Sequence, residues 1–168
     1  MKKLFVLFTV LFVMSCGVTV NYDYEKGTDF TLYKTYHYFD DMQTGLSVLD
    51  AKRFFSSLDR ALQDKGYVLS EEPDFIIDIK SSAYQSNQGT SVGMGVGTGG
   101  GGVSVGIPIG EGNVSRQIIF DFVDGKTQQL IWQALSNEPY MPENTPEARE
   151  AQFKVVIDKV LSGFPPKK

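Results

Sequence analysis

The feature that most restricts the fold is a change of hydrophobic period along the chain. Residues 47–65 and 145–163 repeat their apolar side chains every three or four positions, which is typical of helices with one buried face. The buried stripes would be Ala51, Phe54, Phe55, Leu58 and Leu62 in the first, and Phe153, Val156, Ile157, Val160 and Leu161 in the second. Ser47 and Thr145 are suited to cap the two helices, and Pro146 fits a first helical position.

Most of the remaining chain alternates apolar and polar residues, which predicts strands. Residues 18–24 and 33–39 predict two short strands on either side of a turn at Gly27. After Pro73, the residues Phe75, Ile77 and Ile79 share one face of a further strand.

Residues 116–135 predict a hairpin that turns at Asp124-Gly125. A three-residue loop would place Ile118 opposite Trp132 and Phe120 opposite Leu130, because this register matches apolar with apolar residues. The order of strands, helix, strands and helix predicts a single α+β domain over residues 18–166. We expect two layers, a mainly antiparallel sheet with two helices packed on one of its faces.

The glycine-rich segment 91–110 contains overlapping copies of G-x-G-x-x-G, but a phosphate-binding loop of this kind must open a helix. Here an alternating stretch with Pro108 follows, so we predict a β-hairpin that turns at Gly100-Gly101. One face would be apolar, and the other would be nearly bare, with Gly93, Gly95, Gly97, Ser104 and Gly106 beside Pro108. Glycine in strands often marks the close approach of another backbone. The favoured interpretation is a structural hairpin, and a partner-facing surface or a disordered segment are the alternatives.

Residues 1–15 predict a signal peptide that is removed. Two lysines precede an apolar run, Leu4–Met14, that is too short for a bilayer span of about 20 residues. The sequence VMSC resembles a bacterial lipobox, with cleavage between Ser15 and Cys16 and a lipidated N-terminus at residues 16–17. Cys16 is the only cysteine and therefore has no internal disulfide partner. The alternative is an ordinary signal peptide followed by an incidental cysteine.

The same segment predicts an address in the cell. Cleavage removes Lys2 and Lys3 from the 16 basic residues and leaves all 20 acidic ones, so the mature chain is acidic. No basic stripe stands out, and we expect no nucleic-acid partner. No acidic run follows Gly17, which resembles Gram-negative lipoproteins sorted to the outer membrane and facing the periplasm. The lipid on Cys16 would then hold the protein to the membrane.

The residues offer few candidates for catalysis. His37 is the single histidine, and Asp78 and Asp121 are acids in the middle of predicted strands, where alternation places them on a solvent face. Cys and His are too few for a metal site, no EF-hand pattern is present, and we expect no cofactor. A carboxylate-dependent envelope hydrolase would need Asp78 or Asp121 to meet His37 in a cleft of the sheet.

The segments YDYEKGTDFTLYKTYHYF, LDRALQDKGYVLSEEPDFIIDIK, IIFDFVDGKTQQLIWQAL and GFPP occur in this order between Val18 and Pro166. Together they resemble a family of bacterial envelope lipoproteins known as domain of unknown function 4136. The resemblance implies an envelope address and a fold, and it brings no catalytic residue or ligand. We therefore expect a lipid-anchored, non-enzymatic binding or assembly module, with an envelope protein as a candidate partner, and keep the hydrolase as the alternative.

Overall fold

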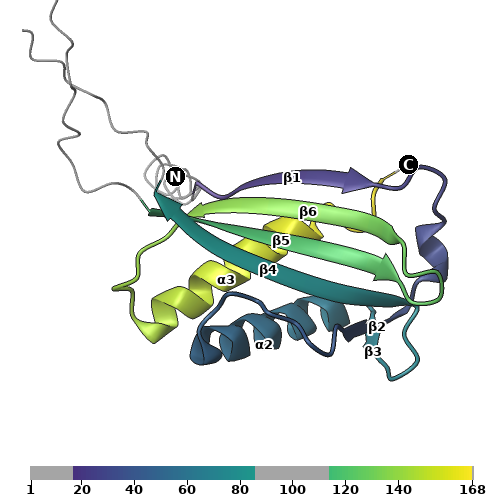
Figure 1. The fold of residues 1–168 in the computed structure, drawn as a ribbon, viewed down its shortest axis with the longest axis horizontal. Coiled ribbons are helices and arrows are strands. Elements are labelled where there is room, and N and C mark those ends of the chain that lie inside the picture. The colour runs from purple at the N-terminus through teal and green to yellow at the C-terminus, as the bar shows by residue number, and fades with distance from the viewer. Residues whose placement is uncertain (1–16, 86–113, 168) are drawn as a thin grey trace, which may run out of the picture.

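The structure is a computed structural model that describes residues 17–85 and 114–167 (Figure 1). These residues form a six-stranded sheet in the order β1-β6-β5-β4-β2-β3 and two α-helices. The elements are β1 (Thr19–Tyr24), β2 (Thr35–Tyr38), α2 (Val48–Asp64), β3 (Val68–Leu69), β4 (Phe75–Gln85), β5 (Val114–Asp124), β6 (Leu130–Pro139) and α3 (Pro146–Leu161). A short 3-10 turn, η2, covers Phe30–Leu32.

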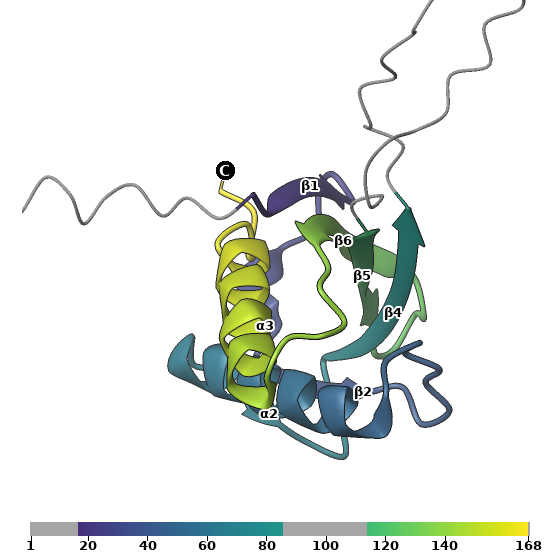
Figure 2. The same ribbon diagram turned by 90° about the vertical axis from the view of Figure 1, so that its left-hand side faces the viewer.

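The predicted α+β architecture is confirmed. The pairs β1–β6, β6–β5 and β5–β4 are antiparallel, and only the short strand β2 pairs in parallel, with β4 and β3. Figure 2 shows both helices on the same side of the curved sheet. The predicted two layers are therefore present.

Both helices begin where their capping residues predict. The Ser47 hydroxyl accepts the N–H of Asp50 at 3.2 Å, and the Thr145 hydroxyl accepts that of Ala148 at 3.3 Å. These bonds satisfy backbone donors that a helix N-terminus leaves without partners. Asp59 then holds α2 over β2, because one of its carboxylate oxygens accepts the hydroxyls of two tyrosines, Tyr36 at 2.8 Å and Tyr38 at 2.6 Å.

The predicted strands on either side of the Gly27 turn are confirmed. Both strands form, but β6, β5 and β4 lie between β1 and β2 in the sheet. The chain after Gly27 does not fold back on β1. It crosses the end of the sheet through η2, where the Phe30 ring packs edge-on against Phe164 at 5.8 Å. Contact with Phe164, which is distant in sequence, therefore directs the chain after the turn away from β1.

The predicted hairpin register is wrong. Phe122 lies opposite Trp132 and Phe120 opposite Ala134, so the partners are shifted by four residues. The turn is longer than three residues because the Asp124 carboxylate accepts the N–H groups of Lys126 and Thr127, at 2.8 and 2.7 Å. The even shift keeps Ile118, Phe120 and Trp132 on their predicted core face. Leu130 is the exception, because the register irregularity after Phe122 pairs it with Val123, and it is exposed instead of buried.

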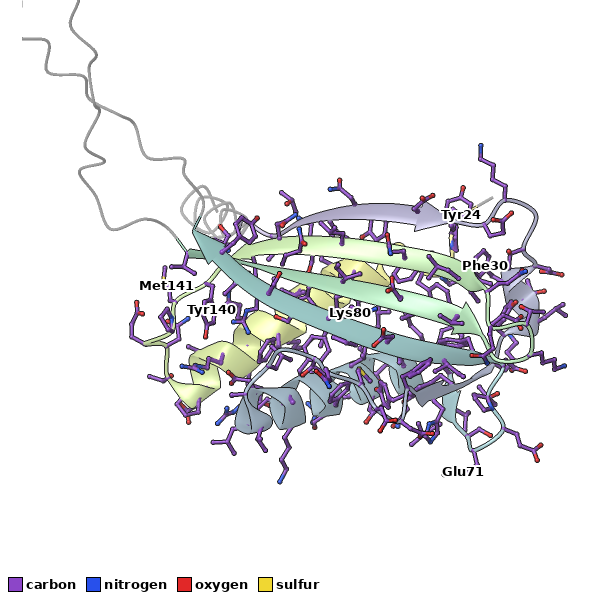
Figure 3. The ribbon with its side chains drawn as sticks, viewed as in Figure 1. Tyr24, Phe30, Glu71, Lys80, Tyr140 and Met141 are labelled. Carbon is purple, nitrogen blue, oxygen red and sulfur yellow. The ribbon has the colours of Figure 1, made fainter. Side chains whose placement is uncertain are left out.

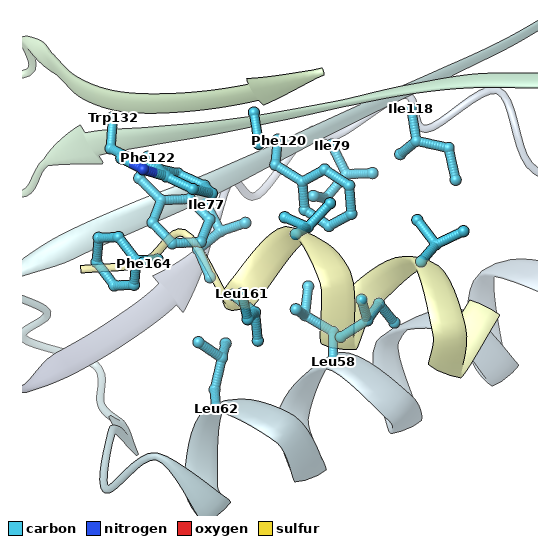
Figure 4. Packing of buried hydrophobic residues seen from close by; sticks show 14 of the residues in the cluster. Leu58, Leu62, Ile77, Ile79, Ile118, Phe120, Phe122, Trp132, Leu161 and Phe164 are labelled. Carbon is cyan, nitrogen blue, oxygen red and sulfur yellow. The ribbon is translucent and has the colours of Figure 1, made fainter. Parts of the chain in front are cut away.

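The core fills the space between the sheet and the helices (Figure 4). The Phe122 ring lies 4.7 Å from both the Trp132 and the Phe164 ring centroids. Phe164 follows α3 and closes the core from the C-terminal end, which explains the GFPP segment. Gly163 is required beside it, since a Cβ atom there would collide with the ring of Tyr22. The predicted stripe of α3, Phe153 to Leu161, is buried as expected.

Candidate functional site

Several predicted site residues lie outside the described part of the chain. They are Ser15 and Cys16 at the cleavage site and the glycine-rich hairpin with Gly93, Gly95, Gly97, Ser104 and Gly106. The structure does describe the strands that flank this hairpin. β4 ends at Gln85 directly opposite Val114, where β5 begins.

Asp78 and Asp121 lie opposite each other on β4 and β5, on the sheet face away from the helices. Lys80 Nζ lies 2.5 Å from an oxygen of Asp78 and 3.3 Å from one of Asp121 (Figure 3). Gln133 donates to the second oxygen of Asp121 at 2.6 Å. Asp78 is the main reason why the pKa of Lys80 is raised. The lysine offsets the repulsion between two facing carboxylates, and the cluster acts as a cross-strand clamp.

His37 lies on β2 opposite Ile76 of β4, two residues along from Asp78 on the same face of the sheet. Its Nδ1 lies 2.9 Å from the carbonyl oxygen of Tyr38, and its Nε2 lies 3.8 Å from the exposed carboxylate of Glu71. The surface pocket that it lines, of about 340 Å³, contains neither Asp78 nor Asp121. The hydrolase hypothesis needs Asp78 or Asp121 to meet His37, and no hydrogen bond or ion pair joins His37 to either carboxylate in the described part of the chain.

A larger cleft lies at the end of the sheet where β1 ends. It has a volume of about 700 Å³ and separates the segment after β1 from the turn between β5 and β6. Its lining is Glu25, Thr28, Asp29, Leu32, Tyr33, Asp74, Asp124, Lys126, Thr127, Gln129, Leu130 and Ile131. Tyr24 and Phe30 mark this end in Figure 3, and Tyr140 and Met141 mark the opposite end.

Two carboxylates build the walls of the cleft. Asp124 accepts the Tyr33 hydroxyl at 2.6 Å, and this bond is the main reason why its pKa falls to about 2. Burial and the same carboxylate raise the pKa of Tyr33 to about 12. Asp74 accepts the backbone N–H groups of Lys34 and Thr35 at 2.8 and 3.0 Å, and the Lys34 bond is the main cause of its lowered pKa. Neither Asp124 nor Tyr33 can exchange a proton near neutral pH, so this arrangement suits binding better than acid–base chemistry.

The cleft combines apolar contact area with negative charge. Leu32 and Leu130 are both exposed and come from its two walls. Four acidic residues and one lysine, Lys126, line it. In the sequence these acids stand at turns and strand ends, and nothing there indicates that they share a cleft. The two walls, residues 25–33 and 124–131, are far apart in the chain.

A buried ion pair near the other end of the sheet was missed by the sequence analysis. Arg116 Nε lies 3.1 Å from Glu138 Oε1, and the guanidinium lies over the rings of Tyr140 and Phe153, at 4.1 and 4.9 Å. Burial raises the pKa of Glu138 to about 7 and lowers that of Arg116. The sequence does contain a signal for the burial of Arg116, because it lies two residues before the core residue Ile118 and therefore on the same face of the strand.

Within residues 17–85 and 114–167, no group of three or more histidine, cysteine, aspartate or glutamate side chains could hold a metal ion. In the same ranges no helix has the length and apolar character needed to span a bilayer.

Comparison with known proteins gives a family and a fold. The family described as Domain of unknown function (DUF4136) matches residues 20–166. A solved DUF4136 family protein from Bacteroides thetaiotaomicron is 14% identical, with a TM-score of 0.54 over 88% of this chain and 96% of that one. None of the curated proteins matches the sequence.

Two further solved structures share the fold. The PelC dodecamer from Paraburkholderia phytofirmans is 12% identical, with a TM-score of 0.54 over 90% of this chain and 99% of that chain. A PDZ domain protein from Parabacteroides distasonis is 12% identical, with a TM-score of 0.59 over 99% of this chain. This chain spans only 41% of the length of that protein. At these identities the likeness concerns the fold alone.

Proposed function

Since the chain belongs to the DUF4136 family, we propose that it is a lipid-anchored protein of the bacterial cell envelope that acts as a non-enzymatic binding or assembly module. The lipid on Cys16 would hold it to a membrane, and the outer membrane, with the domain facing the periplasm, is the compartment that its N-terminal sequence favours.

The observation that carries this proposal is the position of the cleft. The strand β1 begins at Thr19, three residues after Cys16, and ends at Tyr24, next to the cleft residue Glu25. The anchor and the cleft are thus at opposite ends of the same strand. A protein tethered by Cys16 would present the cleft away from its lipid, where a partner in the aqueous compartment can reach it.

The chemistry of the described residues favours binding over hydrolysis. Among the described residues His37 bonds to neither Asp78 nor Asp121, and these two carboxylates are held by Lys80. In the cleft, Asp124 is held by Tyr33. The apolar side chains of Leu32 and Leu130 supply contact area that a protein surface can cover.

An assembly role draws support from PelC, whose dodecamer indicates that a chain of similar fold can associate with its own copies. The partner of this protein would accordingly be another envelope protein or a second copy. The predicted bare face of the glycine-rich hairpin is a second surface that such a partner could use.

The test is a photo-crosslinking amino acid placed in the cleft of the lipidated protein in living cells. Position 130 is the probe, and Val155 on α3 is the matched control, because the two side chains are similarly exposed, 48% and 42%. We expect a defined protein adduct from position 130 and none of the same size from position 155. Identical adducts from both positions, or none from the cleft, would refute a binding role for the cleft.

A further inference from the structure

The first described residues are locked into the domain. Val18 is only 3% exposed and belongs to the hydrophobic core, and its carbonyl oxygen accepts a hydrogen bond from Lys159 Nζ. Two residue steps separate Val18 from Cys16, and they span at most about 7 Å when fully extended. A lipid anchor on Cys16, as proposed above, would therefore hold one end of the domain against the bilayer.

The strand register identifies what else lies at that end. Thr19 is opposite Asn137, and the chain continues past Asn137 to Tyr140, whose N–H donates to Val114 O at 2.7 Å. Residues 138–140 advance about 10 Å along the sheet beyond Asn137. The three residue steps from Thr19 back to Cys16 can advance no further than this in the same direction. Met141 follows Tyr140 and thus reaches at least to the level of the anchor.

Exposed apolar side chains gather at this end. Met141 and Tyr84 are exposed, and the Tyr84 hydroxyl donates to the Asn137 side chain at 3.0 Å. Val48 and Leu49 are exposed in the first turn of α2. Arg149 joins this turn to the segment after Met141, since it donates to Asp50 at 2.9 Å and to the carbonyl of Pro142. Figure 3 shows Tyr140 and Met141 together at this end of the sheet.

Apolar exposure alone would not select this end, because Leu32, Val68 and Leu130 are exposed elsewhere. The short tether does select it. We propose that the end face formed by Val48, Leu49, Tyr84 and Met141 rests on the lipid bilayer that carries the anchor, with Met141 in the headgroup region. Tyrosine rings and short apolar side chains are well suited to the membrane–water interface. The cleft at the opposite end would then face away from the membrane.

The experiment compares two tryptophan variants of the full lipidated protein, Met141→Trp and Leu130→Trp. The replaced side chains are similarly exposed, 53% and 48%, and lie at opposite ends of β6, since Leu130 begins this strand and Met141 follows its last residue, Pro139, by two positions. The native Trp132 is fully buried, and the emission of the wild type is subtracted from that of each variant. Each protein is reconstituted into phosphatidylethanolamine–phosphatidylglycerol vesicles, with and without brominated acyl chains.

We expect brominated lipid to reduce the added emission of Met141→Trp about twofold, as for a ring at the membrane interface, and to leave Leu130→Trp unchanged. Equal quenching of the two variants, or no quenching of Met141→Trp, would overturn the proposed orientation. Leu49→Trp, on α2 at the same end, replaces Met141→Trp if that variant does not fold, and the same result is expected.

Sedimentation of the same vesicles separates this inference from the proposed anchor on which it rests. If the protein stays in the supernatant and Cys16 carries no lipid, the anchor proposal fails, and the orientation fails with it. If the protein sediments with the vesicles but position 141 is not quenched, the orientation alone is wrong.

Discussion

Replacing Glu138 by glutamine should abolish most of the pH dependence of folding stability between pH 4.5 and about 7. Glu138 is 2% exposed, and its carboxylate lies 3.1 Å from Arg116 Nε. Burial raises its pKa from 4.5 to about 7, and this effect outweighs the lowering by Arg116. The native state therefore favours the protonated, neutral form of Glu138 more than the unfolded state does.

The sign of the effect follows from proton binding. Between pH 4.5 and about 7 the native state binds more protons than the unfolded state, so the free energy of unfolding falls as the pH rises through this window. The stabilisation is fully present below pH 4.5 and is lost above about 7. A shift of this size corresponds to about 3 kcal/mol. The lowered pKa of Asp124, about 2, acts in the opposite direction and only below its ordinary value of 3.8.

The assay is urea unfolding of the wild type and Glu138→Gln at several pH values across and above this window. Glu71→Gln is the control, because its side chain is 96% exposed. We expect the wild type and the control to lose stability as the pH rises, and Glu138→Gln to show a flat profile. The reasoning would be refuted if Glu138→Gln kept the wild-type slope, or if wild-type stability rose with pH across the window.

Three further predictions concern the fold and the glycine-rich segment. Gly45→Ala should destabilise the domain by about 1–3 kcal/mol in urea unfolding, since Gly45 has a φ of +70° and an added Cβ would collide with the carbonyl oxygen of Ser81; an unchanged midpoint would contradict this. Thr145→Ala should cost about 1 kcal/mol by removing the cap of α3, and a Thr145→Ser control should retain most of the stability. For a partner that binds the hairpin instead of the cleft, deleting residues 93–110 should abolish capture while thermal unfolding stays cooperative; retained capture would show that the hairpin is not the binding surface.

The helices could be predicted because their signals are local. Ser47 and Thr145 cap them by bonds within four residues, and the two apolar stripes face the core as their spacing requires. The side-chain faces of β4 and β5 followed in the same way from alternation.

Strand pairing depends on contacts that a local period does not contain. The register between β5 and β6 is set by a turn in which the Asp124 carboxylate binds two N–H groups and Gln128 adopts a φ of +58°. The partner of β1 is β6, more than 100 residues later in the chain, because β6 offers an open edge next to the core residue Trp132.

The candidate site was beyond reach for the same reason. The two walls of the cleft meet through bonds between distant segments: the Tyr33 hydroxyl donates to Asp124, 91 positions away, and the Glu25 N–H donates to Ile131 O at 3.0 Å. Arg116 and Glu138 each occupy a core-facing position of a strand where an apolar residue is expected. Either residue alone indicates only an irregular strand face, and their pairing becomes visible only when β5 and β6 are aligned.

The most direct test of the account is the intact mass of the mature protein purified from membranes of its host. We predict a chain that begins at Cys16 and carries a diacylglycerol and further acyl chains on this residue, and that Cys16→Ser abolishes the lipid. A wild-type protein that begins at another residue, or that begins at Cys16 without lipid, would contradict the anchor from which the orientation and the placement of the cleft follow.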